Sequence, residues 1–115
     1  NVGAQLTLSL PDMKEFVNGR GDIGNYLYEL YTNNPLHKQR GVIDQTWRTW
    51  VIWDVINIAW MIEPSWVPSH IVSSPVLNDE LFWKRENESY PMREAFGVNR
   101  DAIFHDFFVK IDKLK

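Results

Sequence analysis

The sequence predicts a single α/β domain spanning residues 1–115, in which helices pack on a few strands. Polar and apolar residues alternate in two parts of the chain, as they do in half-buried strands. Elsewhere apolar residues recur at helical spacing. The composition, with 44% hydrophobic and 23% charged residues, is that of a globular chain. A chain of this length buries roughly two-thirds of its unfolded surface, which is enough for a core.

The N-terminal third predicts one strand followed by two helices. Residues 2–10 alternate between apolar and small or polar types, which indicates a strand. Ser9 is suited to cap a first helix, which residues 18–21 should end with two glycines. Asp22 can cap a second helix, and the Asn-Asn-Pro sequence at 33–35 should end it.

The central part predicts a polar loop at 36–45 and then a buried helix at 46–62. The helix is predicted because the segment is apolar on all sides, and Glu63 followed by Pro64 should end it. Its start stays open, since it can begin near Trp47 or only at Asp54.

The last third predicts several short strands and a final helix. The strands are expected at 71–72, 76–77, 81–83 and 92–98. Asn78 and Asp79 favour a turn between two of them, and Asn99 can cap the helix. The helix should turn one apolar face inward, made of Ile103, Phe104, Phe107, Phe108, Ile111 and Leu114.

Charge and composition exclude several classes of function. A net charge of -3 and a pI near 5.5 argue against nucleic-acid binding, which needs a basic surface. The apolar run at 50–62 is shorter than the about 20 residues of a membrane span and contains Asp54 and Asn57. The chain has no cysteine, so thiolate metal sites are excluded while the cellular compartment stays open. It begins without Met, and we expect it to be cut from a longer protein.

Asp54 is the clearest candidate for a functional residue, because its carboxylate lies within the most apolar stretch of the chain. A buried carboxylate must find a partner. It can cap a helix that starts at Val55, coordinate calcium or magnesium, or pair with Arg48 if the helix is continuous.

Tryptophans surround this acid, with Trp47, Trp50 and Trp53 at intervals of three residues. Packing in the core explains such spacing. The alternative is a set of rings that receives a planar base or a sugar.

The chain resembles the C-terminal third of the nucleoside hydrolases of the inosine-uridine type. The resemblance rests on the segments 51–59, 75–77, 90–93 and 99–104, together with Pro64. It implies that this chain is the C-terminal portion of a larger mixed-sheet fold whose complete form cleaves the N-glycosidic bond of ribonucleosides.

The resemblance also implies roles for the central residues. An acid at the position of Asp54 is a ligand of the catalytic calcium, which also binds the ribose hydroxyls and the attacking water. Trp53 stands where some members carry a His that serves the leaving base, and Trp here is similar to the purine-preferring branch. Trp50 and Trp47 are expected to join the same base-binding pocket.

The sequence departs from the family in one respect that affects activity. The aspartate-rich D-x-D-x-x-x-D-D loop, which supplies the other calcium ligands, is missing. We therefore expect the chain alone to be inactive and to need a complementary N-terminal chain, or to form a homo-oligomer. The alternatives are a non-catalytic interaction or ligand-binding module built round the Trp-rich segment, and a purely structural domain.

Overall fold

The computed structural model describes residues 2–35, 48–85 and 89–114. The elements, in chain order, are η1 (Val2–Gln5), β1 (Thr7–Ser9), α1 (Leu10–Phe16), α2 (Gly21–Asn33), β2 (Thr49–Val51), α4 (Val55–Ile62), η2 (Pro64–Trp66), β3 (Ser69–Ser73), β4 (Pro75–Leu77), β5 (Trp83–Arg85), β6 (Pro91–Ala95) and α5 (Arg100–Asp112). The predicted mixture of helices and strands is confirmed.

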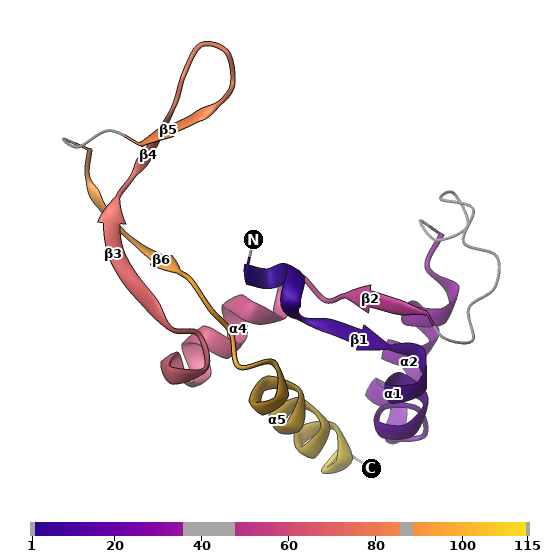
Figure 1. The fold of residues 1–115 in the computed structure, drawn as a ribbon. Helices are drawn as coiled ribbons and strands as arrows, with labels where there is room; N and C mark the ends of the chain where they lie inside the picture. The colour runs from indigo at the N-terminus through magenta and orange to yellow at the C-terminus, as the bar shows by residue number, and fades with distance from the viewer. Residues whose placement is uncertain (1, 36–47, 86–88, 115) are drawn as a thin grey trace.

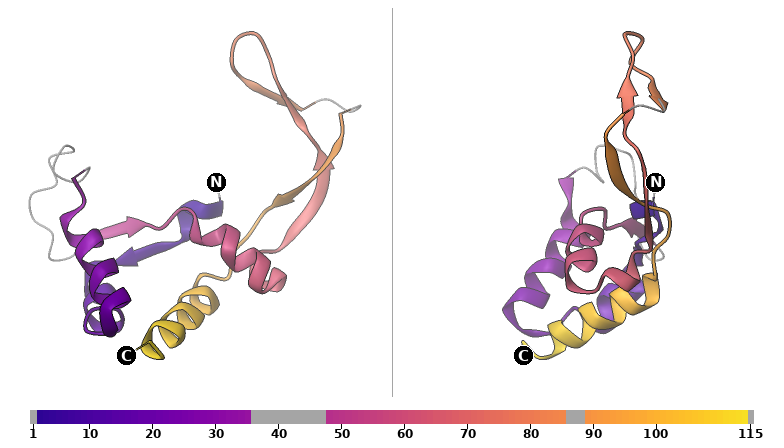
Figure 2. Two further views of the ribbon diagram at one scale, coloured as in Figure 1. Left: turned by 180° about the vertical axis from the view of Figure 1, so that it is seen from behind. Right: turned by 90° about the vertical axis from the view of Figure 1, so that its left-hand side faces the viewer.

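The chain divides into a helical body and a projecting arm (Figure 1). The body contains η1, β1, β2, η2, α1, α2, α4 and α5, whereas the arm contains β3 to β6 and extends away from it in every view (Figure 2). In the described parts of the chain the strands form two-stranded antiparallel sheets, β1 with β2, β3 with β6 and β4 with β5.

The N-terminal strand is shorter than the alternation over 2–10 predicted. Residues Val2–Gln5 form a 3-10 turn instead, in which the Leu6 N–H donates to the Gly3 carbonyl at 3.1 Å. The strand is confirmed only over Thr7–Ser9, because Ser9 caps the next helix, which begins at Leu10. Its side chain accepts a hydrogen bond from the Asp12 N–H at 3.1 Å, so the predicted cap is confirmed.

The boundaries of the second helix follow the prediction closely, except at its cap. Gly19 and Gly21 adopt φ of +77° and +73°, which suits glycine and separates α1 from α2. The helix begins at Gly21, so Asp22 lies in its first turn and does not cap it. The predicted end at Asn33 is confirmed.

The central helix takes the later of its two predicted starts, because α4 begins at Val55, directly after Asp54. Thr49–Val51 form β2, which pairs with β1 so that Leu8 lies opposite Trp50, and the helix starts only at Val55. It is also not buried all round, because Ala59 is its one buried residue and Met61 is 77% exposed. The loop predicted at 36–45 lies outside the described residues.

The core lies between the β1–β2 sheet and the surrounding helices. Its buried side chains are Leu6, Leu8, Met13, Val17, Tyr31, Ala59, Val67, Ile103, Phe104 and Ile111. Arg100, at the start of α5, fastens this helix to the sheet by donating from Nε and Nη2 to the Thr7 carbonyl at 3.0 and 2.7 Å. The packed core and the Arg100 hydrogen bonds fix β1, and β1 in turn positions its partner strand β2.

The last helix forms as predicted, with one exception at its end. The side chain of Asn99 accepts a hydrogen bond from the Ala102 N–H at 3.1 Å, which confirms the cap. Most of the predicted apolar face packs on the core, but Leu114 is 51% exposed because it follows the end of the helix. Among the described residues, no helix combines the length and apolar character needed to cross a bilayer.

The arm consists of two antiparallel strand pairs, and the pair β4–β5 lies between β3 and β6 in the sequence. β3 pairs with β6 from Ser69 opposite Ala95 to Ser73 opposite Pro91, and β4 then pairs with β5. The strands predicted at 71–72, 76–77 and 92–98 are confirmed in position, although β6 ends at Ala95. The strand predicted at 81–83 begins only at Trp83, because residues 78–82 form the turn.

Candidate functional site

A pocket of about 340 Å³ lies where β2 meets the start of α4. Trp50, Trp53 and Asp54 line one part of it, and Leu27 and Phe107 line others. The elements α2, β2 and α5 therefore all contribute to its wall. The volume falls within the range of about 300–1,000 Å³ that is common for small-molecule sites.

Asp54 lies at the edge of this pocket and is exposed, which corrects the expectation of a buried carboxylate. The apolar stretch around it does not enclose it, because β2 ends at Val51 and the chain turns at the protein surface before α4. A carboxylate in contact with water needs no partner to offset desolvation. Its oxygens are therefore available for a ligand.

The helix-cap hypothesis for Asp54 is wrong. Asp54 occupies the position before α4 but makes no side-chain capping hydrogen bond. Its backbone, with φ -84° and ψ -14°, is already helical, whereas a capping residue usually adopts an extended conformation. The Asn57 N–H instead donates to the backbone carbonyl of Asp54 at 3.2 Å.

The ion-pair hypothesis for Asp54 also fails. Arg48 points to α2, where its Nη2 donates to the Tyr31 carbonyl at 2.6 Å and its guanidinium lies 4.8 Å from the Tyr31 ring centre. The continuous helix that would bring Arg48 next to Asp54 does not form, since β2 intervenes. Within the described residues, no ion pair joins the two side chains.

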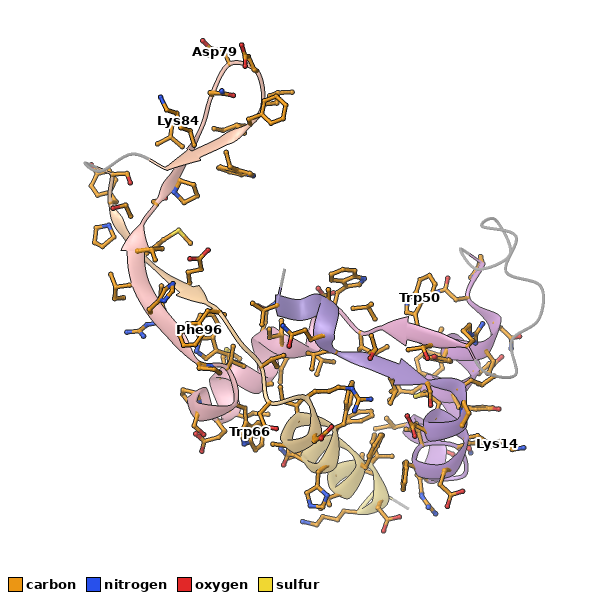
Figure 3. All side chains as sticks on the ribbon, in the orientation of Figure 1. Lys14, Trp50, Trp66, Asp79, Lys84 and Phe96 are labelled. Atoms are coloured by element: carbon orange, nitrogen blue, oxygen red, sulfur yellow. The ribbon has the colours of Figure 1, made fainter. Side chains whose placement is uncertain are left out.

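The tryptophans separate into two groups. Trp50, labelled on β2 in Figure 3, packs against the core, as the packing hypothesis predicted, and it also lines the pocket. Trp53 is 49% exposed and lines the same pocket next to Asp54. Trp60 lies at a different surface hollow beside Val2. Trp47 lies outside the described residues.

Asp54 can supply one hard oxygen ligand to a metal ion, but calcium takes six to eight. Within the described parts of the chain, no group of three or more His, Asp or Glu side chains gathers in a way that could hold a metal. Asp54 therefore fits a calcium site as one of its ligands, and the other donors must come from elsewhere.

Tyr31 is a buried polar residue at this pocket that the sequence pattern did not single out. Its hydroxyl donates to the Leu8 carbonyl at 2.6 Å, which links α2 to β1 beneath the pocket. Burial is the main cause that raises the pKa of Tyr31 above 10.0, and the nearby Arg48 opposes this rise. In the sequence Tyr31 shows only helical spacing, which does not distinguish it from any other core aromatic.

A larger hollow of about 600 Å³ lies between α1 and α5, but both of its arginines already have partners. The Arg20 Nε lies 3.3 Å from an oxygen of Asp112, and Arg100 donates to the Thr7 carbonyl. We therefore take the pocket beside Asp54 as the candidate site.

Comparison of this chain with protein-family models, with curated proteins and with solved structures finds no match.

Proposed function

We propose that this chain is the C-terminal portion of a calcium-dependent nucleoside hydrolase and completes its larger mixed sheet. In this proposal Asp54 is one ligand of the calcium ion. Trp53 and Trp50 bind the base of a ribonucleoside, and Trp47 joins them. The enzyme cleaves the N-glycosidic bond between ribose and base.

The observation that carries the proposal is the position of Asp54. Its carboxylate is exposed, makes no helix-capping bond and borders the pocket that Trp50 and Trp53 line. A free carboxylate beside exposed indole rings provides both functions that a nucleoside site needs, a hard oxygen donor for the metal and an aromatic surface for the base.

The residues have distinct parts in the reaction. When bound, calcium supplies the positive charge that orients the ribose and activates the attacking water. Asp54 would supply one of the oxygen ligands of the ion. Trp53 would stack on the base and stabilise it as it departs, but the indole N–H is not acidic enough to act as a general acid, so Trp53 does not protonate the leaving group.

The mostly apolar wall of the pocket supports binding of a base. Leu27, Ile52, Val55 and Phe107 line it around the two indoles, and Asp54 contributes a carboxylate at its edge. Apolar walls with a few placed polar groups are typical of small-molecule sites. A purine or pyrimidine ring would bury its faces there while the ribose points to Asp54.

Calcium binding tests the division of ligands between this chain and the rest of the enzyme. Because one carboxylate supplies too few donors, the 115-residue chain should bind calcium no more tightly than about 1 mM, as weak calcium sites do. Isothermal titration calorimetry measures this directly. Binding in the micromolar range would show that the chain carries a complete site and would contradict the proposal.

Activity is tested with the product of the whole gene. Asp54→Asn removes the charge and keeps the shape of the side chain, so hydrolysis of inosine should fall by about 100-fold or more. Glu29→Gln, a matched change at an exposed acid on α2, should leave activity unchanged. Full activity of Asp54→Asn, or loss in both variants, would contradict a role as ligand.

A second function, an interaction module, is favoured by one observation. Helix α4 exposes Ile58 and Ile62 by 54% and 50%, next to the strongly exposed Met61. Such a surface suits a protein partner. The gene sequence that precedes Asn1 separates the two functions: an aspartate-rich D-x-D-x-x-x-D-D run favours the hydrolase, and its absence favours the module.

A further inference from the structure

The arm ends in a tight turn that presents large apolar side chains. We define the arm tip as residues 78–84. Two hydrogen bonds join Asn78 to Phe82 across the turn. The side-chain oxygen of Asn78 accepts from the Phe82 N–H at 2.8 Å, and the backbone N–H of Asn78 donates to the Phe82 carbonyl at 3.0 Å. Asp79 and Lys84 lie at the end of the arm farthest from the body (Figure 3).

Three consecutive apolar residues at this tip face solvent. Leu81, Phe82 and Trp83 are 77%, 68% and 72% exposed. An isolated exposed apolar residue is ordinary, but a contiguous group of this kind marks a contact surface.

Leu81 adds a second sign that the tip is specialised. Its φ of 64° is the only positive value outside glycine among the described residues. The left-handed conformation is unfavourable for a branched residue, and glycine or asparagine would adopt it more easily. A strained leucine that is exposed contributes nothing to the core of its own chain.

The charges that flank these residues make the tip of one copy complementary to the tip of a second copy. Glu80 precedes the apolar group and Lys84 follows it. If two tips run antiparallel about Phe82, Glu80 of each copy lies opposite Lys84 of the other, and Leu81 lies opposite Trp83. A parallel arrangement would bring like charges together and is disfavoured.

We propose that two copies of this chain associate through their arm tips, antiparallel and with two-fold symmetry about Phe82. The partner is a second copy because the charge order is self-complementary, which is the property that a two-fold interface requires. The arm holds the tip away from the body in every view, so two tips can meet without a clash between bodies (Figure 2). This inference is independent of the proposed hydrolase function.

The size of the apolar group sets the strength of the contact. Three large side chains exposed by 68–77% offer about 400 Å² per copy, against the about 800 Å² per partner of a standard stable interface. We therefore expect a weak, reversible dimer that forms between about 10 and 500 μM.

Exchange of the two charges gives the sharpest test. Glu80→Lys and Lys84→Glu should each be monomeric by sedimentation equilibrium, with a dissociation constant raised at least tenfold, because each places like charges opposite each other. An equimolar mixture of the two variants should form a heterodimer, since opposite charges then face each other at both positions. Homodimers of either variant, or no heterodimer in the mixture, would overturn the proposal.

Apolar variants test the same interface by another route. Trp83→Ser should abolish the dimer, whereas Tyr90→Ser, which removes an aromatic that is 88% exposed outside the tip, should not. A dimer that persists in Trp83→Ser overturns the proposal. So does a chain that stays monomeric at about 500 μM but sediments with vesicles of phosphatidylcholine through Trp83, since the tip would then meet lipid.

Discussion

Tyr31 shows how a single polar group can organise several elements at once. Its hydroxyl donates to the Leu8 carbonyl at 2.6 Å, and its own carbonyl accepts from Arg48 at 2.6 Å. With 7% of its surface exposed, Tyr31 therefore connects α2, β1 and the start of β2 within the core. Removing the hydroxyl would leave a buried carbonyl without this donor.

We predict that Tyr31→Phe lowers the free energy of unfolding by about 1 kcal/mol near pH 8, through loss of the hydrogen bond. The pKa of Tyr31 is raised in the folded chain, chiefly by burial, so folding favours the protonated form. This contribution is complete below pH 10.0 and is lost as the pH rises through the folded pKa. Urea titrations between pH 8 and pH 11 should show the difference between wild type and Tyr31→Phe shrinking only above pH 10. A difference that is constant with pH would contradict the pKa shift.

Roles that depend on residues close by in the sequence could often be predicted. Roles that depend on residues far away in the sequence could not. The caps at Ser9 and Asn99 were predicted because a capping bond joins residues only three apart. The exposure of Asp54 could not be predicted, because it depends on β1 pairing with β2. The three tryptophans suggested one stack, yet Trp50 lies on β2 and Trp53 lies in the turn between β2 and α4.

At the scale of elements, backbone conformation decides which polar residue stabilises a helix. Asn99 and Asp54 both directly precede helices, and both are common capping types. Asn99, with φ -88° and ψ 83°, lies outside the helix and accepts from the Ala102 N–H. Asp54 has helical φ and ψ and accepts no capping bond.

We therefore predict that Asn99→Ala lowers the free energy of unfolding by about 1 kcal/mol, whereas Asp54→Ala changes it by less than about 0.5 kcal/mol. Urea denaturation of the two variants at neutral pH checks this, with Ser9→Ala as a second capping control. A loss of about 1 kcal/mol in Asp54→Ala would restore the cap hypothesis and weaken the ligand hypothesis.

The central segment shows why the start of one helix could not be predicted. Residues 49–51 and 55–62 together look like one apolar helix, but the first part is rich in residues that favour strands, and β1 offers it a partner. A pattern within one segment cannot reveal a partner more than 40 residues away in the sequence, here Thr7 opposite Val51. Where pairing was between neighbours, as in β4 with β5, both strands were predicted, although β5 was placed two residues too early.

At the scale of the whole molecule, the arm gives the chain an elongated shape. The radius of gyration of the Cα atoms is 17.6 Å and the principal extents are 52, 34 and 20 Å. A compact domain of this length has a radius of about 13 Å. The sequence could not predict this shape, because Leu81, Phe82 and Trp83 resemble core residues and give no sign that they project from the body.

We predict that small-angle X-ray scattering of the dilute chain, below the concentration at which it dimerises, gives a radius of gyration well above about 13 Å. The arm should account for most of the excess, because it extends beyond the body in every view (Figure 2). A value near about 13 Å would mean that the arm folds back onto the body. The exposed apolar tip would then be covered by its own chain.

Arg100 has a consequence for the order in which the protein assembles. Its hydrogen bonds to the Thr7 carbonyl join residues 93 positions apart. On the ribosome, where the N-terminal part emerges first, the Thr7 carbonyl can meet this partner only after the residues up to Arg100 have been made. The hairpins of the arm pair residues that lie closer together in the sequence, and they can form within microseconds once they emerge. The arm can therefore form before helix α5 docks on the β1–β2 sheet and closes the core.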